Sequence, residues 1–109
     1  MAVVTRKSGD TTILEPDGRL AAGAVDEFRS KWTEAIRDAS GHNIVVNLGR
    51  VTMLDSTGIG TMIRCHNAVT KNGGRMKIVA ASPGVRQAFK VTRLDSVFEF
   101  YDNEQSALT

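Results

Sequence analysis

The chain has 109 residues, of which 41% are hydrophobic and 24% charged, and its fourteen basic and twelve acidic side chains leave a formal net charge of +2. This length fits one domain, residues 1–109, and excludes a separate substrate domain. The small net charge, the scattered basic residues and the lack of a repeated basic–aromatic pattern argue against nucleic-acid binding.

No apolar run approaches the roughly 18 residues needed to cross a bilayer, and the first residues carry no secretory pattern. We therefore expect a cytoplasmic protein without direct membrane insertion. A single cysteine, Cys65, excludes an internal disulfide and a cysteine-based metal site.

Two β-type runs open the chain. Residues 2–7 predict one strand, and the β-type run within residues 11–20 predicts a second strand that pairs with it as a hairpin across residues 8–10. The turn signal Pro16-Asp17-Gly18 is expected to end the second strand.

A helix and a central strand follow. Apolar positions recur at helical spacing over residues 25–39, and Gly41 marks the end of this amphipathic helix. Residues 43–48 are apolar on both faces except at Asn47, which is typical of a strand covered on both sides. Gly49-Arg50 then leads into a loop.

The segment MLDSTGIG, residues 53–60, lies at the junction of this loop with a second helix. Apolar residues recur at helical intervals from Ser56 to about Asn72, where Gly73-Gly74 end the helix. Ser56 is the expected N-cap, because its hydroxyl can accept a hydrogen bond from a free N–H group of the first turn.

The remaining elements alternate in type. Residues 75–81 predict a strand, Ser82-Pro83 predicts the start of a helix, residues 96–101 predict a last strand and residues 103–108 a terminal helix. The order β-β-α-β-α-β-α-β-α predicts an α/β fold with a mixed sheet whose centre is parallel.

The glycines of the motif need an explanation beyond helix capping. Gly58 and Gly60 fall within the first turn and a half of the helix, where each costs about 0.8 to 1 kcal/mol relative to alanine. Their presence indicates tight packing on the sheet or close approach by a partner.

The motif does not predict a hydrolase. A serine elbow requires a glycine where Leu54 stands, and His66 lies about 15 Å from Ser56 along the helix at 1.5 Å per residue. His42 precedes the central strand and is expected at its opposite end. We expect His66 to be a packed helix residue and His42 a solvated loop residue.

Nucleotide and metal chemistry are excluded in the same way. Gly58-Ile59-Gly60 lacks the third glycine of a dinucleotide motif, which Ile63 replaces, and no Gly-Lys-Ser/Thr sequence occurs. Asp55 follows a strand as a phosphoryl acceptor would, but no paired acids accompany the first strand to hold magnesium. We expect no cofactor, no metal and no catalytic residue.

Ser56 can instead be a substrate. A protein kinase supplies its own base, and a phosphate on Ser56 would meet the free N–H groups and positive dipole of the helix start. It would also add a charge of about −1.5 to −2 beside Asp55, which disfavours a surface fitted to the neutral serine. The motif thus predicts a binding switch.

These residues resemble the STAS-domain anti-sigma-factor antagonist family. The resemblance covers nearly the whole chain and includes the strand VVNL, the Asp-Ser-x-Gly-x-Gly signature that begins at Asp55, a helix, a glycine pair and a strand. It implies a STAS fold, a four- to five-stranded mixed β-sheet with about four α-helices packed mainly on one face.

The resemblance also implies a function. Family members bind, when unphosphorylated, an anti-sigma factor that is itself a serine kinase, and so release a sigma factor for transcription. The kinase uses its own ATP to phosphorylate the motif serine, here Ser56, and a serine phosphatase reverses this. Asp55, Thr57, Gly58 and Gly60 are the implied partner-binding residues.

One position departs from the family pattern. Many members carry Gly-x-Leu-Asp before the first helix, whereas this chain reads Gly18-Arg19-Leu20-Ala21. The missing acid leaves open altered kinase recognition, or a STAS docking module in a stressosome-like scaffold or a lipid-transporter complex.

Overall fold

A computed structural model describes residues 1–38 and 43–109 of the chain. In these residues strands and helices largely alternate, as β1 (Ala2–Ser8), β2 (Thr11–Leu20), α1 (Asp26–Arg37), β3 (Asn43–Asn47), β4 (Val51–Leu54), α2 (Ser56–Lys71), β5 (Met76–Val79), α3 (Pro83–Val91), β6 (Glu99–Tyr101) and α4 (Glu104–Leu108). The hairpin, the four helices and the strands β3, β5 and β6 all occur where the sequence predicts them; the helices α1, α2 and α4 and these three strands are shorter than predicted, and β1 is one residue longer.

The strands form one mixed sheet in the order β1-β2-β3-β5-β6, and β4 pairs with β2 beyond this path. The β1–β2 pair is antiparallel, and the other pairs are parallel. This agrees with the expected mixed sheet with a parallel centre, although the six strands include one more than the upper expectation.

The additional strand is β4, and its pairing with β2 shows that two local predictions from the sequence are wrong. Pro16-Asp17-Gly18 does not end β2, which continues to Leu20, and residues 51–54 form β4 where a loop was expected. Pro16 is tolerated because β2 pairs with β3 only up to Leu14 and with β4 only from Gly18, so the proline lies between the two ladders.

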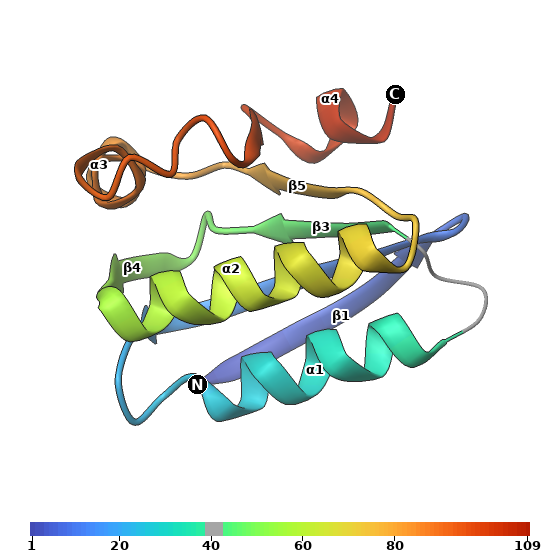
Figure 1. Cartoon of the computed structure of the whole chain (residues 1–109), viewed down its shortest axis with the longest axis horizontal. Helices are drawn as coiled ribbons and strands as arrows, with labels where there is room; N and C mark the ends of the chain where they lie inside the picture. The colour runs from blue at the N-terminus through green and yellow to red at the C-terminus, as the bar shows by residue number, and fades with distance from the viewer. Residues whose placement is uncertain (39–42) are drawn as a thin grey trace.

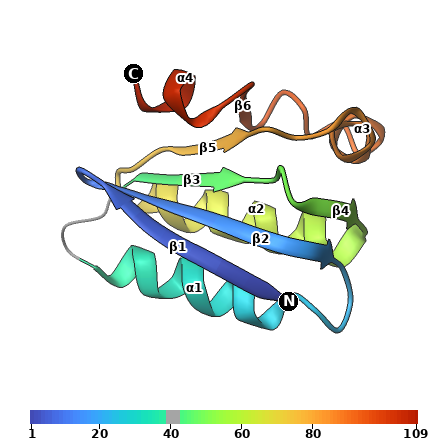
Figure 2. The ribbon, with the colours of Figure 1, turned by 180° about the vertical axis from the view of Figure 1, so that it is seen from behind.

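The helices lie mainly on one face of the sheet. Figure 1 shows α1 and α2 side by side in front of the strands, and Figure 2 shows β1 and β2 from the opposite side. The buried side chains between the sheet and α1, α2 and α3 form the main core, which includes Leu14, Ile44, Val46, Ile78, Phe28, Trp32, Met62 and Phe89.

The opposite face of the sheet has a smaller cluster. Ala107 of α4 packs there with Ile13, Val45 and Val79. Residues 43–48 are apolar on both faces because β3 is buried on both faces. Val45 belongs to the small cluster, while its neighbours in β3 belong to the main core.

The ends of the helices follow local capping rules. Ser82 caps α3 as predicted, its Oγ accepting a hydrogen bond from the N–H of Val85 at 3.2 Å, with Pro83 in the first turn. The helix α1 is described as far as Arg37, and the predicted end at Gly41 falls outside the described residues.

Candidate functional site

The motif begins where β4 ends and α2 starts, beside the end of β2. Asp55, not Ser56, is the N-cap of α2, with an extended backbone at φ −108° and ψ −171°. Its Oδ1 accepts a hydrogen bond from the N–H of Gly58 at 2.9 Å. The prediction of Ser56 as the cap is wrong because the carboxylate one residue earlier already satisfies that donor, which makes Ser56 the first helical residue.

The second carboxylate oxygen of Asp55 reaches a different part of the chain. Oδ2 accepts a hydrogen bond from the backbone N–H of Ala22 at 3.0 Å, in the turn between β2 and α1. The N–H of Ala22, followed by that of Gly58, lowers the pKa of Asp55 below its usual value because both bonds favour the charged form. Asp55 is therefore an ionised side chain held at both oxygens.

Gly58 is required by packing inside the chain. A Cβ atom at this position would lie 2.0 Å from the carbonyl oxygen of Leu20 and 2.8 Å from Cδ2 of Leu54. The bare backbone of Gly58 therefore lets α2 start directly against the end of β2, which is one of the two explanations that the sequence left open.

Gly60 has no such constraint. A Cβ atom there would meet nothing within 4 Å among the described residues. Because Gly60 has no Cβ atom, space is left on the surface at the start of α2, where Ser56 and Thr57 are both exposed. The two glycines of the signature thus have different surroundings, one internal and one open.

Ala21 lies in the turn that Asp55 contacts. Its side chain is only 7% exposed, and its carbonyl oxygen accepts a hydrogen bond from the N–H of Ala24 at 2.9 Å. Gly23 has a φ of +85°, a left-handed conformation that glycine adopts without strain. The position where the family resemblance leads us to expect an acid is here a buried methyl group.

The described histidine is not placed to act on Ser56. The ring of His66 packs edge-on against Phe98, with ring centroids 5.3 Å apart and planes at 73°. It therefore belongs to the contact of α2 with the segment after α3, as predicted for a packed helix residue. His42 lies outside the described residues.

The cysteine is also unsuited to chemistry. Cys65 is fully buried in the main core, and burial raises the pKa of its thiol to about 12. Among the described residues, no group of three or more histidine, cysteine or acidic side chains could hold a metal ion.

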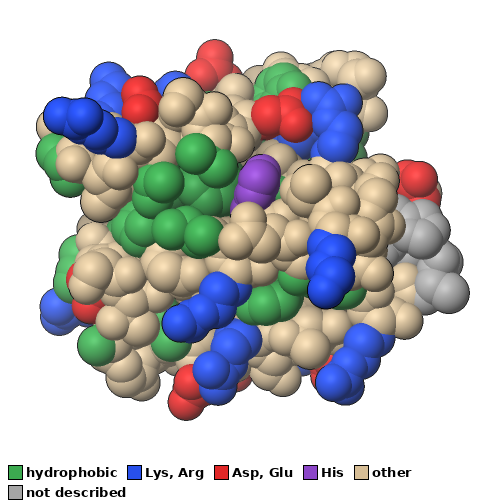
Figure 3. All heavy atoms as spheres, in the orientation of Figure 1, with side chains coloured by type: hydrophobic (Ala, Val, Ile, Leu, Met, Phe, Trp, Pro, Cys, Tyr) green, Lys and Arg blue, Asp and Glu red, His purple; other side chains and the backbone are tan. Residues whose placement is uncertain are grey.

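An apolar surface adjoins the start of α2. Figure 3 shows hydrophobic side chains gathered between α2 and α3, next to the histidine. Leu54 and Ile63, which flank Ser56 in the sequence, are packed against the core but only partly buried. Partly buried apolar side chains therefore lie just before the motif and along the helix that the exposed serine begins, and apolar surface of this kind is what protein partners cover.

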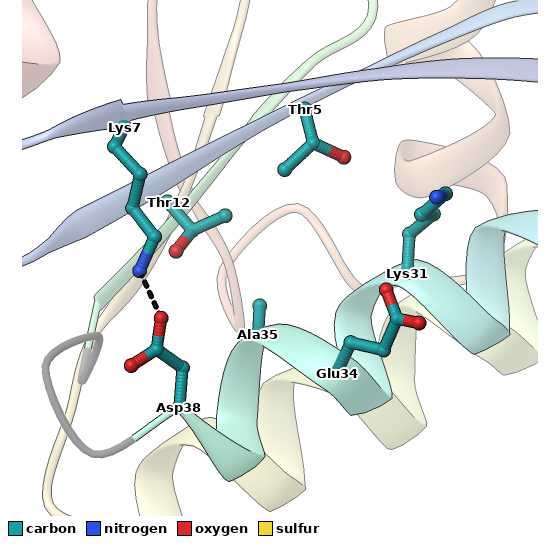
Figure 4. A pocket seen from close by; sticks show the side chains of 7 residues that line it. All are labelled: Thr5, Lys7, Thr12, Lys31, Glu34, Ala35 and Asp38. Carbon is teal, nitrogen blue, oxygen red and sulfur yellow. Dashed lines mark hydrogen bonds and ion pairs between the residues drawn. The ribbon is translucent and has the colours of Figure 1, made fainter.

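A pocket of about 170 Å³ lies elsewhere, between α1 and the strands β1 and β2 (Figure 4). It contains the ion pair of Lys7 with Asp38 and is lined by Thr5, Lys7, Thr12, Lys31, Glu34, Ala35 and Asp38. None of the predicted site residues lines it. Its two cations and two acids balance, so it has no clear charge preference for a ligand.

The sequence missed the backbone groups that complete the site. The N–H of Ala22 and the carbonyl oxygen of Leu20 position Asp55 and Gly58, respectively. Because every residue has a backbone carbonyl and every residue except proline has a backbone N–H, the residue types at positions 20 and 22 offered no signal.

Comparison with known proteins identifies similar chains. The model of the STAS domain family matches residues 2–107. An anti-sigma F factor antagonist of Paenibacillus polymyxa is 29% identical over 97 residues, covering 89% of this chain and 83% of its own length. No helix in the described part of the chain is both long and apolar enough to span a membrane.

Two solved structures share the fold. A STAS domain protein from Planctomyces limnophilus superimposes with a TM-score of 0.87 at 21% identity, covering 97% of this chain and 94% of its own. The phosphorylated form of SpoIIAA from Bacillus gives a TM-score of 0.76 at 24% identity, and the match covers 98% of this chain and 96% of the SpoIIAA chain.

Proposed function

Because the chain belongs to the STAS domain family, we propose that it is an anti-sigma-factor antagonist controlled by phosphorylation at Ser56. The unphosphorylated form binds an anti-sigma factor that is a serine kinase, and this binding releases a sigma factor. The similarity of the chain to an anti-sigma F factor antagonist of Paenibacillus polymyxa supports this proposal.

The exposure of Ser56 at the start of α2 carries the proposal. Its hydroxyl is accessible to a kinase that brings its own catalytic base and its own ATP. Asp55 is a weakened base, because both of its oxygens accept backbone hydrogen bonds and its pKa is lowered. The chain is then a substrate and binding protein rather than an enzyme, and it needs no cofactor.

The partner surface in this proposal consists of the start of α2. Thr57 is exposed beside Ser56, Gly60 leaves open space one turn later, and Asp55 and Gly58 hold this helix start in place. The apolar surface between α2 and α3 extends the same face (Figure 3). A cytoplasmic location follows from the proposal, because transcription takes place there.

Phosphorylation of Ser56 would weaken binding of the partner because it adds negative charge to the partner surface. A phosphate on Ser56 carries about −1.5 to −2 charge next to the ionised Asp55, so a partner would have to desolvate two adjacent anions. The phosphorylated form of the structurally similar SpoIIAA is consistent with a phosphate on this fold. A serine phosphatase would restore the binding form.

The proposal is tested by incubating the protein with candidate anti-sigma factor kinases and radiolabelled ATP, followed by mapping of the modified residue. We expect label on Ser56, none on Ser56→Ala, and undiminished label on Ser96→Ala, which removes an exposed hydroxyl outside the proposed partner surface. Label on Thr57 or Asp55 instead would contradict the assignment. Kinase binding without any label would support the fixed docking module, which the buried Ala21 in place of an acid also favours.

A further inference from the structure

Asp55 joins two segments that are distant in the sequence. One of its oxygens accepts the N–H of Gly58 in α2, and the other accepts the N–H of Ala22 in the β2–α1 turn, 33 positions away. In Figure 1 this turn runs beside the start of α2. The same two segments also touch through Gly58, whose Cα has no room for a side chain against the carbonyl oxygen of Leu20.

The turn is part of the surface around Ser56. Ala22 and Gly23 are exposed, whereas Ala21 is buried beneath them. The described part of the turn has no charged side chain from residue 21 to residue 25, so Asp55 is the charged group that contacts its backbone. A displacement of the Asp55 carboxylate therefore acts on the turn directly, through its hydrogen bond with the N–H of Ala22.

Phosphorylation of Ser56 would change the surroundings of Asp55. A phosphate on the first helical residue is attracted to the N–H groups of the first turn, and it therefore competes with Asp55 for the N–H of Gly58. The two anions are neighbours in the chain and repel each other. The carboxylate can lower this repulsion by leaving its position, which breaks its bond to Ala22.

We infer that Asp55 is a positioning residue through which a phosphate on Ser56 releases the β2–α1 turn, so that the turn and the start of α2 form one phosphorylation-sensitive surface. This inference rests on the proposed function for the presence of the phosphate and adds a second segment to the surface that responds to it. The ligand on this surface is the kinase partner, and the turn presents it with small, uncharged groups.

The test uses phosphoserine encoded at position 56 during translation, so it requires neither a kinase nor a partner. Backbone amide exchange of the labelled protein is measured by NMR for four forms, which combine Ser56 or phosphoserine with Asp55 or Asp55→Asn. Asparagine and aspartate are equally good N-cap residues. The single acceptor oxygen of asparagine therefore retains the bond to Gly58 and loses the one to Ala22.

We expect phosphoserine to speed the exchange of the Ala22 amide by about fivefold or more, as local opening requires. Asp55→Asn alone should do the same while the Gly58 amide stays protected. In the Asp55→Asn background, phosphoserine should add less than about twofold at Ala22, because the connection is already broken. A residue that only stabilised the helix would not show this loss of the phosphate effect.

Two controls keep the outcome decisive. The Val85 amide, capped by Ser82 at the start of α3, should be unchanged in all forms. Phosphoserine at Ser96, an exposed serine after α3, adds the same charge and should leave Ala22 unchanged. An Ala22 amide that ignores phosphoserine at position 56, or responds equally with and without Asp55, would overturn the inference. Either result leaves labelling of Ser56 by a kinase intact, so the two proposals fail separately.

Discussion

An alanine at position 58 would place its Cβ atom 2.0 Å from the backbone oxygen of Leu20, whereas an alanine at position 60 would meet nothing within 4 Å. The first clash is with backbone and cannot be relieved by a side-chain rotation. The second position is an ordinary helix site with free space. These two glycines of one signature therefore make opposite predictions for stability.

Gly58→Ala should lower the free energy of unfolding by about 2 kcal/mol or more, the cost of an overpacked site. Gly60→Ala should raise it by about 0.5 to 1 kcal/mol, because alanine favours a helix over glycine. Urea denaturation of the two variants and the parent measures both values. Equal stability of Gly58→Ala and the parent would show that the close approach to Leu20 is not a constraint.

Asp55 makes a prediction for the dependence of stability on pH. Its pKa is lower in the folded chain than in the unfolded one, so it stabilises the fold fully above its unfolded pKa and loses this effect as the pH falls through its folded pKa. The other carboxylates make the same contribution to the pH dependence of stability in the parent and in Asp55→Asn.

The parent should therefore be more stable than Asp55→Asn at pH 7, and the difference should shrink as the pH falls from about 5 towards 2. Thermal or urea unfolding of both proteins over this range measures the difference. A difference that stays constant with pH would mean that the charge of Asp55 does not contribute.

At this scale the sequence predicted that a helix starts at the Asp-Ser pair but not how the backbone holds the two side chains. The Asp-Ser pair and the helix start follow from residue types and periodicity. The shift of the cap from Ser56 to Asp55, and the bond to Ala22, depend on where the β2–α1 turn lies in space. No local pattern encodes that position.

At the scale of elements, α1 and α2 are joined by a buried hydrogen bond. The Nε1–H of Trp32 donates to Oγ1 of Thr61 at 3.2 Å, and both side chains are almost fully buried. Because the two helices lie side by side on the sheet, this bond fixes their relative position as well as satisfying both groups.

Thr61→Val keeps the shape of the side chain and removes the acceptor, leaving the indole N–H of Trp32 buried without a partner. We expect a loss of about 1 to 3 kcal/mol in the free energy of unfolding. Thr61→Ser keeps the hydroxyl and serves as the control for the hydrogen bond. A Thr61→Val variant as stable as the parent would show that this bond is not needed.

The helices could be predicted more reliably than the strands. The period of apolar residues in α1, α2 and α3 gives their positions directly. The strand β4 has four residues and no alternation strong enough to identify it, and Pro16 and Gly18 in β2 resemble a turn. Both residues occur inside a strand because β2 pairs with β1 through Pro16 and Asp17 on one edge, and with β3 and then β4 on the other.

At the scale of the whole molecule, the candidate site and the opposite face of the sheet are separate. Three helices cover one face, and α4 packs on the other, where Glu104 is held by Arg6 and Asn47. The fold class and the mixed sheet could be predicted from the alternation of elements. The side of the sheet on which α4 packs could not, because one buried alanine in a five-residue helix carries little pattern.

This separation means that a switch at Ser56 does not require rearrangement of the sheet. The start of α2 and the β2–α1 turn lie at one end of the molecule, and the charge that a phosphate adds acts within a few residues of them. The core packing of α2 through Met62, Cys65 and Val69 can stay unchanged while the surface changes its affinity.

The most direct test of the account is the affinity of the kinase partner for the protein with serine or encoded phosphoserine at position 56, measured by isothermal titration with ADP present. We predict tight binding of the serine form, similar binding of Ser56→Ala, and binding at least tenfold weaker for the phosphoserine form, a difference of about 1.4 kcal/mol or more. Equal affinity of the serine and phosphoserine forms would contradict the switch.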